Sequence, residues 1–359
     1  MANKTARLGD LATYINGYAF KPADWGDTGL PIIRIQDLTG NSYQLNRYDG
    51  EYPERIEVND GDVLISWSAS LGVYVWQRGK ALLNQHIFKV VFDKIPVNKE
   101  YFVFAVEHKL AEMESKTHGA TMKHIVKKDF DGTTIPYPPI EKQAEIADHL
   151  RRITSLIDRQ TEQLLLLDQL VKSRFIELFG DQTANPYAWQ QTSIGACCTL
   201  KSGTSLPADK ENEGGAIPYV KVGDMNYPGN EQYITTSSRF VSEQTAGTGV
   251  FPVGTVVFPK RGGAIGTNKK RLTRLPICAD LNVMGVTAGR RLTPQYLMAY
   301  FNTVDLGTLN NGSSVPQINN KDIAPLLICI PPMALQEQFA AFVEQTDKSK
   351  LCGMMEVAA

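Results

Sequence analysis

The chain has 359 residues, of which 43% are hydrophobic, and its formal net charge is −1. This length is enough for two or three domains with sizeable hydrophobic cores. No run approaches about 18 consecutive apolar residues, and the first residues lack the apolar stretch of a secretory signal. We therefore expect a cytoplasmic protein. The near-neutral charge excludes a uniformly basic surface, although local basic patches remain compatible with it.

The cysteines and histidines are not spaced like metal ligands. All five cysteines lie in the second half of the chain, and all five histidines lie before residue 150. Tetrahedral zinc sites need such residues clustered at short spacings. The sequence also lacks a glycine-rich phosphate loop and a nucleophile–base–carboxylate set. We expect reduced structural thiols, with no metal, cofactor or catalytic residue on this chain.

An internal repeat divides the chain into two copies. Between Gly119 and Ala147, nine of 29 residues are identical to those 193 positions later, whereas ordinary composition gives about two matches. The identical residues include Pro138, Pro139 and Gln143 in the first copy, and Pro331, Pro332 and Gln336 in the second. Upstream, Asn16-Gly17 corresponds to Ser202-Gly203. The sequence therefore predicts one structural design used twice.

Each copy begins with a globular region. Apolar and β-branched runs bounded by glycine, proline, asparagine and aspartate predict strands. These runs are 31–35, 63–67 and 87–92 in the first copy, and 217–222, 255–258 and 277–286 in the second. Helical patterns cover 101–114 and 295–301.

A long helix follows the first globular region. Pro138, Pro139 and Glu141 suit a helix start, and Gly180 suits its end. Between them, apolar residues recur at alternating steps of four and three, which predicts a heptad seam. The seam includes Ile146, Leu150, Ile153, Ile157, Leu164, Leu167 and Val171. Such a helix would be about 60 Å long and needs a partner for its apolar stripe.

The second copy restarts this seam after Pro331-Pro332, with Phe339 and Val343. Thr346 and Lys350 then occupy the positions of Ile153 and Ile157, and Gly353 weakens the helix further. The sequence therefore predicts a short second helix over 332–350 and a tail over 351–359.

This organisation resembles the specificity subunits of type I restriction-modification systems. The resemblance covers almost the whole chain and rests on the order of globular domain, long helix, globular domain and helix. It also rests on a Pro-Pro-x-x-x-Gln-x-x-Ile/Phe pattern at each helix start and on a junction before the second globular region, Phe179-Gly180-Asp181 followed by Asn185-Pro186-Tyr187-Ala188-Trp189.

The resemblance implies an α+β protein with two repeated mixed α/β target-recognition domains, joined by long antiparallel coiled-coil-like helices. The expected parts are target-recognition domain 1 (1–138), spacer helix 1 (139–180), target-recognition domain 2 (181–331), spacer helix 2 (332–350) and the tail (351–359).

It further implies a non-catalytic DNA-binding role. Each domain would read half of a split double-stranded target, while the helices set the spacing and dock two methyltransferase subunits along the seam. Restriction subunits would complete the complex, and S-adenosylmethionine, ATP and magnesium would bind to the partner subunits. Two readers on one face of a duplex need half-site centres about one turn apart.

The second copy contains a basic, glycine-rich stretch at 260–271, with five basic residues and no acidic one. Lysine and arginine neutralise phosphates or read guanine, and amide side chains can pair with adenine. The predicted DNA contacts in this copy are Lys221, Lys260, Arg261, Asn268, Lys269, Lys270, Ser313, Ser314 and Gln317. A solvated basic hairpin remains the alternative.

The aligned region of the first copy is polar but uncharged. Its predicted DNA contacts are Arg34, Gln36, Ser66, Ser68, Ser70, Lys123 and His124. A serine-rich turn without DNA contacts is an equal alternative, and Arg34 and Lys221 could instead form structural ion pairs.

Two other functions remain open at this point. A helix-mediated scaffold whose domains bind protein would suit the near-neutral charge. The short second helix would suit a truncated or recombined specificity subunit that associates with a second copy through its unpaired stripe.

Overall fold

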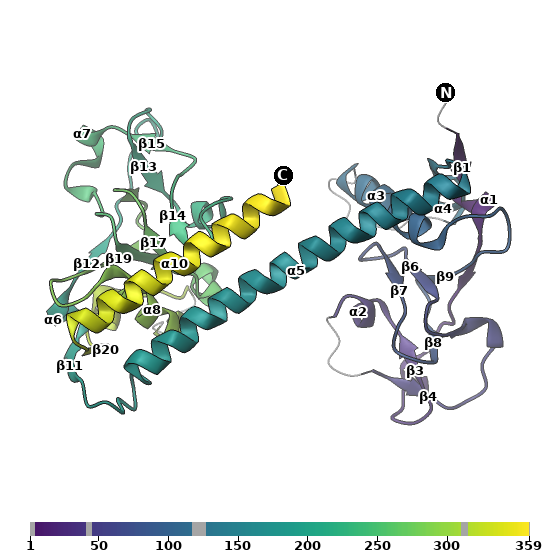
Figure 1. Cartoon of the computed structure of the whole chain (residues 1–359), viewed down its shortest axis with the longest axis horizontal. Helices are drawn as coiled ribbons and strands as arrows, with labels where there is room; N and C mark the ends of the chain where they lie inside the picture. The colour runs from purple at the N-terminus through teal and green to yellow at the C-terminus, as the bar shows by residue number, and fades with distance from the viewer. Residues whose placement is uncertain (1–3, 41–44, 117–126, 310–314, 359) are drawn as a thin grey trace. The chain divides into compact units, whose positions relative to one another are not determined.

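The computed structural model describes residues 4–40, 45–116, 127–309 and 315–358. The chain forms two compact units, Met1–Ile157 and Asp158–Ala359. Each unit combines helices and sheets, which confirms the predicted α+β class with two mixed domains (Figure 1). The division between the units falls inside helix α5 (Ile140–Phe179), a single helix of 40 residues.

The first unit is built from short strands and helices before α5. In chain order they are β1 (Thr5–Arg7), α1 (Leu8–Leu11), β2 (Thr13–Asn16), η1 (Pro22–Asp24), β3 (Leu30–Ile33), α2 (Ile35–Leu38), β4 (Arg47–Tyr48), η2 (Glu54–Ile56), β5 (Glu57–Val58), β6 (Val63–Ser66), β7 (Gly72–Val75), β8 (Ala81–Leu83), β9 (Ile87–Val91), α3 (Lys99–Lys116), α4 (Lys127–Gly132) and β10 (Thr134–Pro136).

The second unit repeats this plan after α5. Its elements are β11 (Gln190–Ser193), α6 (Ile194–Cys197), β12 (Cys198–Ser202), β13 (Ile217–Val220), η3 (Val222–Asn226), β14 (Tyr233–Ile234), β15 (Phe240–Val241), α7 (Glu243–Ala246), η4 (Gly247–Gly249), β16 (Thr255–Pro259), η5 (Gly263–Thr267), β17 (Arg271–Thr273), β18 (Cys278–Ala279), β19 (Val283–Ala288), α8 (Pro294–Thr303), η6 (Leu306–Leu309), α9 (Asn320–Ile323), β20 (Leu327–Ile330) and α10 (Met333–Ala358).

The two units share one strand order. The first contains a sheet β2-β9-β6-β7, and the second contains β12-β19-β16-β17 with β14 added at its edge. The smaller sheets correspond as well: β3 pairs with β8 in parallel, as β13 does with β18. The predicted duplication is therefore confirmed at the level of topology. The predicted run 277–286 is divided into β18 and β19 by a turn.

A glycine repeated in both copies marks a close approach between backbones. A Cβ atom on Gly17 would lie 2.0 Å from the carbonyl oxygen of Asn84, and one on Gly203 would lie 2.1 Å from that of Asp280. Only glycine fits such a contact, because any side chain would displace the neighbouring strand connection. The repeat therefore preserves a packing constraint as well as a sequence pattern.

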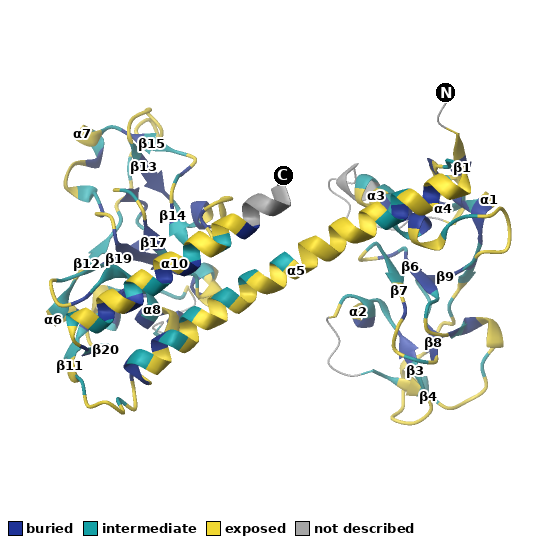
Figure 2. Ribbon diagram, in the orientation of Figure 1, coloured by how far each residue is buried: buried dark blue, intermediate teal, exposed yellow. Residues whose placement is uncertain are grey.

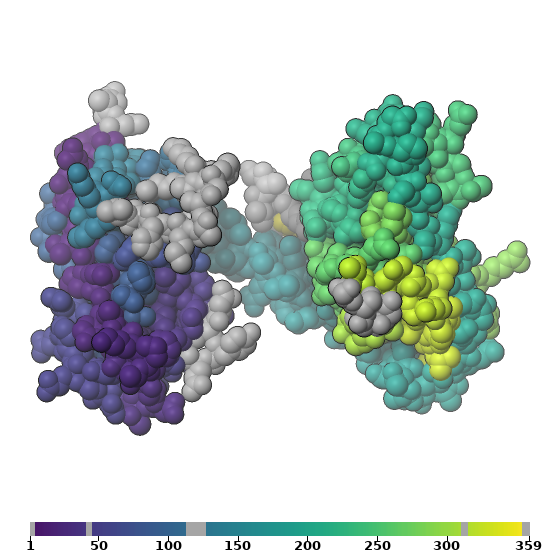
Figure 3. All heavy atoms as spheres, turned by 180° about the vertical axis from the view of Figure 1, so that it is seen from behind, coloured from purple at the N-terminus to yellow at the C-terminus, as the bar shows by residue number. Residues whose placement is uncertain are grey.

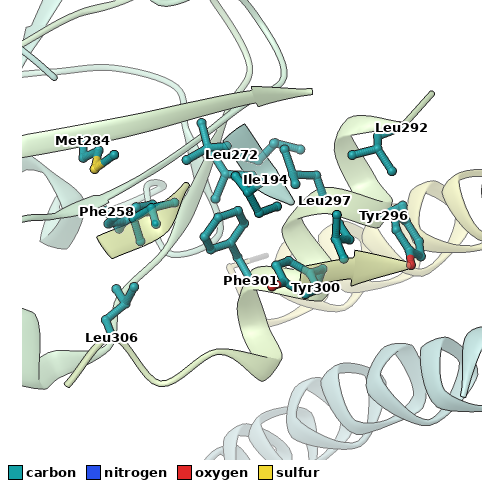
Figure 4. Close-up of a cluster of buried hydrophobic side chains, with 14 of the residues drawn as sticks. Ile194, Phe258, Leu272, Met284, Leu292, Tyr296, Leu297, Tyr300, Phe301 and Leu306 are labelled. Atoms are coloured by element: carbon teal, nitrogen blue, oxygen red, sulfur yellow. The ribbon is translucent and has the colours of Figure 1, made fainter. Parts of the chain in front are cut away.

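The largest core of the second unit lies between α8 and its sheet. Tyr296, Leu297 and Phe301 of α8 are fully buried, as are Phe258 of β16 and Met284 of β19 (Figure 4). The rings of Phe258 and Phe301 lie 5.6 Å apart between centroids. Burying such side chains contributes about 1.5–3 kcal/mol each, so α8 is anchored firmly to the sheet.

A buried glutamine attaches α10 to the globular part of the second unit. The two long helices, α5 and α10, are called the rod helices below. Gln336 is fully buried, and its Oε1 accepts a hydrogen bond from the backbone N–H of Thr293 at 2.9 Å. Its Nε2 donates to the carbonyl oxygens of Pro331 at 2.9 Å and Arg291 at 3.0 Å. Thr293 caps α8, so one side chain joins the starts of α8 and α10.

The first copy contains the same attachment. Gln143 is fully buried, accepts from the backbone N–H of Asn98 at 2.9 Å and donates to the carbonyl oxygen of Pro138 at 2.8 Å. Asn98 in turn accepts from the backbone N–H of Tyr101 in the first turn of α3. The glutamine of the Pro-Pro-x-x-x-Gln pattern thus fixes each rod helix to a domain helix.

Within the second unit, α5 and α10 pack antiparallel. The rings of Phe175 and Phe339 lie 5.6 Å apart, and further along α10 the Nζ of Lys350 lies 2.5 Å from Oδ1 of Asp168. Residue numbers therefore rise along α10 as they fall along α5. The space-filling view shows the yellow C-terminal residues lying against the green residues of this unit (Figure 3).

The second helix is longer than its sequence suggested. The prediction that it ends at 350, before a tail over 351–359, is wrong, because α10 continues to Ala358. Thr346 satisfies its hydroxyl on the carbonyl oxygen of Phe342 at 2.9 Å, and so stays within the helix. Gly353 marks a close approach, since a Cβ atom there would lie 2.9 Å from Oε1 of Gln160.

Near the end of α5, the buried stripe moves from the predicted heptad positions to the residues next to them. Leu164, Leu167 and Val171 are half-buried, and Phe339 and Val343 of the α10 seam are buried. Beyond them, the buried side chains are Phe175 and Phe179, rather than Arg174 and Leu178 of the strict seven-residue pattern. A straight α-helix drifts about 20° per heptad from a 3.5-residue repeat, which explains this shift.

The part of α5 in the first unit has an exposed apolar stripe. Leu150, Ile153 and Ile157 are 37%, 53% and 45% exposed, while Ile146 is half-buried (Figure 2). The predicted seam is therefore covered near the end of α5 and open in its middle.

We predict that Gln336→Ala lowers the free energy of unfolding by about 2 kcal/mol, because it leaves the buried N–H of Thr293 without its acceptor. Urea unfolding of the purified chain measures this change. Gln345→Ala, on the exposed side of α10, is the matched control and changes the same free energy by less than about 0.5 kcal/mol. Equal effects of the two substitutions would contradict the attachment.

Candidate nucleic-acid interface

The connection between β16 and β17 is a tight, glycine-rich loop. Gly262 and Asn268 both have positive φ, at 73° and 53°, and they flank the single turn η5. A non-glycine residue with positive φ is uncommon, and such backbone is concentrated at functional loops. Arg261 and Asn268 are exposed at the two ends of this loop.

A second predicted loop lies directly beside the first. The backbone N–H of Gly262 donates to the carbonyl oxygen of Pro316 at 2.8 Å, and that of Ile318 donates to Lys260 at 2.9 Å. Arg261 and Gln317 face each other across this antiparallel bridge. Two segments that the sequence predicted separately therefore form one surface, with a guanidinium beside an amide.

The same surface includes residues that the sequence analysis missed. The half-buried Lys269 donates from its Nζ to Oδ1 of Asn226 at the end of η3. Tyr227 follows and is 46% exposed. An amide and an exposed aromatic ring can both contact nucleic acid. A single asparagine in a turn gives no sequence signal, because only the fold places it beside the basic loop.

Lys270 is a correction to the predicted contacts. It is only 5% exposed, and its Nζ donates to Oδ1 of Asn268 at 2.7 Å and to the carbonyl oxygen of Val304 at 2.6 Å. Burial lowers its pKa to about 8, opposed by the charge of Asp305. Its amine bonds to the loop from the interior of the domain and does not face solvent. The prediction that Lys270 contacts DNA is therefore wrong.

Lys260 has an intermediate position. It is half-buried, donates to the hydroxyl of Ser202 at 2.9 Å, and has its pKa lowered by burial and by the charge of Arg261. The exposed Arg261 and the half-buried Lys269 therefore stay the candidate basic contacts of this loop.

The corresponding loop of the first unit joins β6 to β7. Ala69 within it has φ of 61°, and the backbone N–H of Trp67 donates to the carbonyl oxygen of His86 at 3.2 Å. His86 also has positive φ, at 73°, and its ring lies 5.0 Å from that of Trp67. Like its counterpart, the loop therefore contains a residue with positive φ, but it carries no basic side chain.

Two of the three predicted serines are buried and are corrections. Ser66 is fully buried and its hydroxyl donates to the carbonyl oxygen of Ser70 at 2.5 Å. Ser68 is only 9% exposed, which leaves little of it for a ligand. Ser70 is exposed at the tip and stays a candidate contact. All four residues of β6 are buried, so neither face of the strand leaves Ser66 open to a ligand.

Arg34 and Lys221 are held in similar ion pairs. Nε of Arg34 lies 3.5 Å from Oδ2 of Asp37, and its guanidinium lies 5.4 Å from the Trp25 ring. Nζ of Lys221 lies 2.6 Å from Oε2 of Glu211. These pairs favour the structural alternative for both residues, whereas Gln36 is exposed.

Four predicted contacts lie outside the described residues: Lys123, His124, Ser313 and Ser314. Among the residues that are described, no group of histidine, cysteine or carboxylate side chains could hold a metal ion. Over the same residues, no helix is long and apolar enough to cross a membrane.

Comparison with known proteins identifies the family. Residues 2–167 and 186–351 each match the type I restriction modification DNA specificity domain, and the chain belongs to this family. The two matches correspond to the two copies of the repeat, and the resemblance predicted from the sequence is confirmed.

Its relatives include named specificity subunits. The chain is 29% identical over 249 residues to the type I restriction enzyme EcoBI specificity subunit of Escherichia coli, covering 61% of this chain and 52% of that protein. It is 21% identical over 353 residues to the MjaIX specificity subunit of Methanocaldococcus jannaschii, covering 89% and 80%. The match with the first of these thus spans about half of the relative's length. Each of these relatives is named as the specificity subunit of a type I restriction enzyme.

Solved structures share the fold. The S subunit of a type I restriction-modification system from M. genitalium superposes with a TM-score of 0.61 at 14% identity, covering 99% of this chain and 92% of that one. A chain from a study of type I R-M system assembly gives a TM-score of 0.55 at 17% identity.

We predict that Lys269→Ala weakens binding to duplex DNA several-fold and reduces the slope of log affinity against log salt by about 1. Lys270→Met is the matched neighbour, and it leaves the salt slope unchanged because its buried amine neutralises no phosphate. Fluorescence anisotropy at several salt concentrations measures affinity and slope. A reduction of the slope in Lys270→Met equal to that in Lys269→Ala would contradict the burial argument.

We also predict a pH dependence of stability that belongs to Lys270. Its folded pKa of about 8 lies below the unfolded value of 10.5, so the unfolded chain binds more protons between these pH values. The free energy of unfolding of the wild type should therefore rise by about 2 kcal/mol, relative to Lys270→Met, from pH 7.5 to 10. Urea unfolding of both proteins measures this difference, which cancels other titrating groups. A constant difference across this range would refute the depressed pKa.

Proposed function

We propose that the chain reads a bipartite double-stranded DNA sequence, with one half-site for each recognition domain. The observation that carries this proposal is the adjoining pair of loops in the second unit, where Arg261, Gln317 and Lys269 lie on one surface. Arginine and amide side chains are the usual readers of guanine and adenine in the major groove. Membership of the DNA specificity domain family supports the same conclusion.

The proposed function gives the two long helices the role of a ruler. Because a helix does not stretch, the number of base pairs between half-sites becomes part of the recognised sequence, with centres about one turn of DNA apart. The continuous α5 and its attachment through Gln143 support this role.

The partners in this proposal are two methyltransferase subunits, joined by restriction subunits in the full complex. The exposed apolar side chains of α5, including Leu150, Ile153 and Ile157, suit a protein interface better than a solvated surface. S-adenosylmethionine, ATP and magnesium would bind to those partners, and the complex would act in the cytoplasm.

Self-association through the same stripe is the competing use of this surface. The exposed stripe favours some partner, and a second copy of the chain is one candidate. Light scattering distinguishes the two: a strictly monomeric isolated chain that binds methyltransferase subunits supports the first use, whereas dimers of the isolated chain support the second.

We predict that cells carrying this chain with its methyltransferase show methylation at a split sequence with one fixed spacer. Methylome sequencing identifies the target, and binding to duplexes with one base pair added or removed between the half-sites should fall at least about tenfold. Unchanged affinity across spacer lengths would refute the ruler.

Charge reversal separates DNA recognition from a protein scaffold. The double variant Arg261→Glu, Lys269→Glu should lose most specific affinity, because two basic groups on the proposed DNA surface become acidic. Arg290→Glu is the matched control: it is exposed and lies beyond the far end of β19. Unaltered DNA affinity in the double variant would favour the scaffold.

A further inference from the structure

Lys350 occupies a position that is apolar in a regular heptad seam, yet its side chain is largely buried and makes polar contacts. Its side chain is 11% exposed, and its Nζ lies 2.5 Å from Oδ1 of Asp168 on α5. The same amine donates to Oε1 of Gln232, just before β14, at 3.2 Å. One side chain thus joins both rod helices to the edge of the recognition sheet.

A second polar contact lies one turn earlier on α10. Asp347 accepts a hydrogen bond from the hydroxyl of Tyr233 in β14, and NH2 of Arg274 lies 3.3 Å from its Oδ2. The guanidinium of Arg274 also stacks on the Tyr233 ring, 3.8 Å from its centroid. The side chain of Asp347 is only 14% exposed, whereas that of Arg274 is 46% exposed and rests on the Tyr233 ring.

These contacts hold the strand that carries the basic loop. β17 is three residues long, with Lys269 two positions before it and Arg274 directly after it. β14 pairs with β17 in parallel, Tyr233 opposite Leu272. Because β17 has only three residues, we expect a shift of Arg274 to move the strand and, with it, the loop that contains Lys269.

The charged residues of these contacts are not repeated at the corresponding positions of the first copy. The residues 193 positions earlier than Asp347 and Lys350 are Thr154 and Ile157. Both are exposed, and neither carries a charge. The glutamine attachment is thus common to both copies, whereas the charged residues Asp347 and Lys350 belong to the second alone.

We propose that Asp347 and Lys350, with Asp168, Gln232, Tyr233 and Arg274, form an orientation clamp that fixes the angle of the second recognition domain on the helix pair. The clamp rests on the proposed DNA-reading function. Its residues are positioning residues, because they hold the basic loop at one angle to the rod and thereby sharpen discrimination between spacer lengths.

The clamp is tested first without DNA, by hydrogen exchange of the full chain. In Lys350→Asp, amides of residues 232–235 and 271–274 should exchange about tenfold faster, because an acidic group replaces the bridging amine. The charge-swapped pair Lys350→Asp, Asp168→Lys should restore protection. Lys348→Asp, exposed on the same helix, is the matched control and leaves exchange unchanged. Unaltered exchange in Lys350→Asp would overturn the clamp.

The functional test uses the complex with methyltransferase subunits and duplexes carrying the methylome-defined target. Lys350→Asp should lose about tenfold in affinity at the correct spacing but less at spacings one base pair longer or shorter, so that the preference between them shrinks. The swapped pair should restore it. An equal loss at every spacing would show a merely structural role and overturn the proposal.

The two proposals fail differently. A wild-type complex without any preferred spacing would remove the ruler function and the role of the clamp in spacing together. A wild type with a sharp preference, combined with Lys350→Asp that keeps it, would overturn only the clamp.

Discussion

Burial of the apolar face at the end of α5 is the contact on which the second unit depends. Phe175 and Phe179 pack against Phe339 of α10 and against Tyr296 of α8, with ring centroids between 4.7 and 5.6 Å apart. Tyr296 also belongs to the core beneath the recognition sheet. One aromatic cluster therefore holds the helix pair and the domain together, and an isolated helix could not bury these rings.

The sequence predicted the repeat and the rod because both depend on periodic apolar positions. Such a pattern reports which side chains avoid water, and Leu164 and Phe339 behave accordingly. It failed at the end of α10, where Lys350 interrupts the apolar seam and Gly353 is unfavourable within a helix. Their roles depend on Asp168, Gln232 and Gln160, which are far away in the chain. The length of α10 therefore depends on contacts with residues far away in the chain, about which a heptad pattern carries no information.

The candidate interface shows a similar limit. Composition identified the basic loop, but Lys269 and Lys270 look equivalent in sequence, and only the fold places the second beneath the loop against Val304. The neighbouring segment at 315–317 was also found, although its pairing with Arg261 required the structure. Asn226 was missed because an isolated amide is common in turns. Local charge thus located the surface, while long-range packing selected its members.

The two copies keep the same attachment but differ where they would meet a ligand. Gln143 and Gln336 attach each rod helix through corresponding hydrogen bonds, whereas the loop beside Ser70 is uncharged and its counterpart beside Arg261 is basic. The same asymmetry extends to the helices, since the charged Lys350 of α10 corresponds to the apolar Ile157 of α5. The basic loop and the polar contacts of α10 therefore occur in the same unit. Under the proposed function this combination is physically consistent, because salt-dependent attraction selects no register unless the charged groups are fixed in angle.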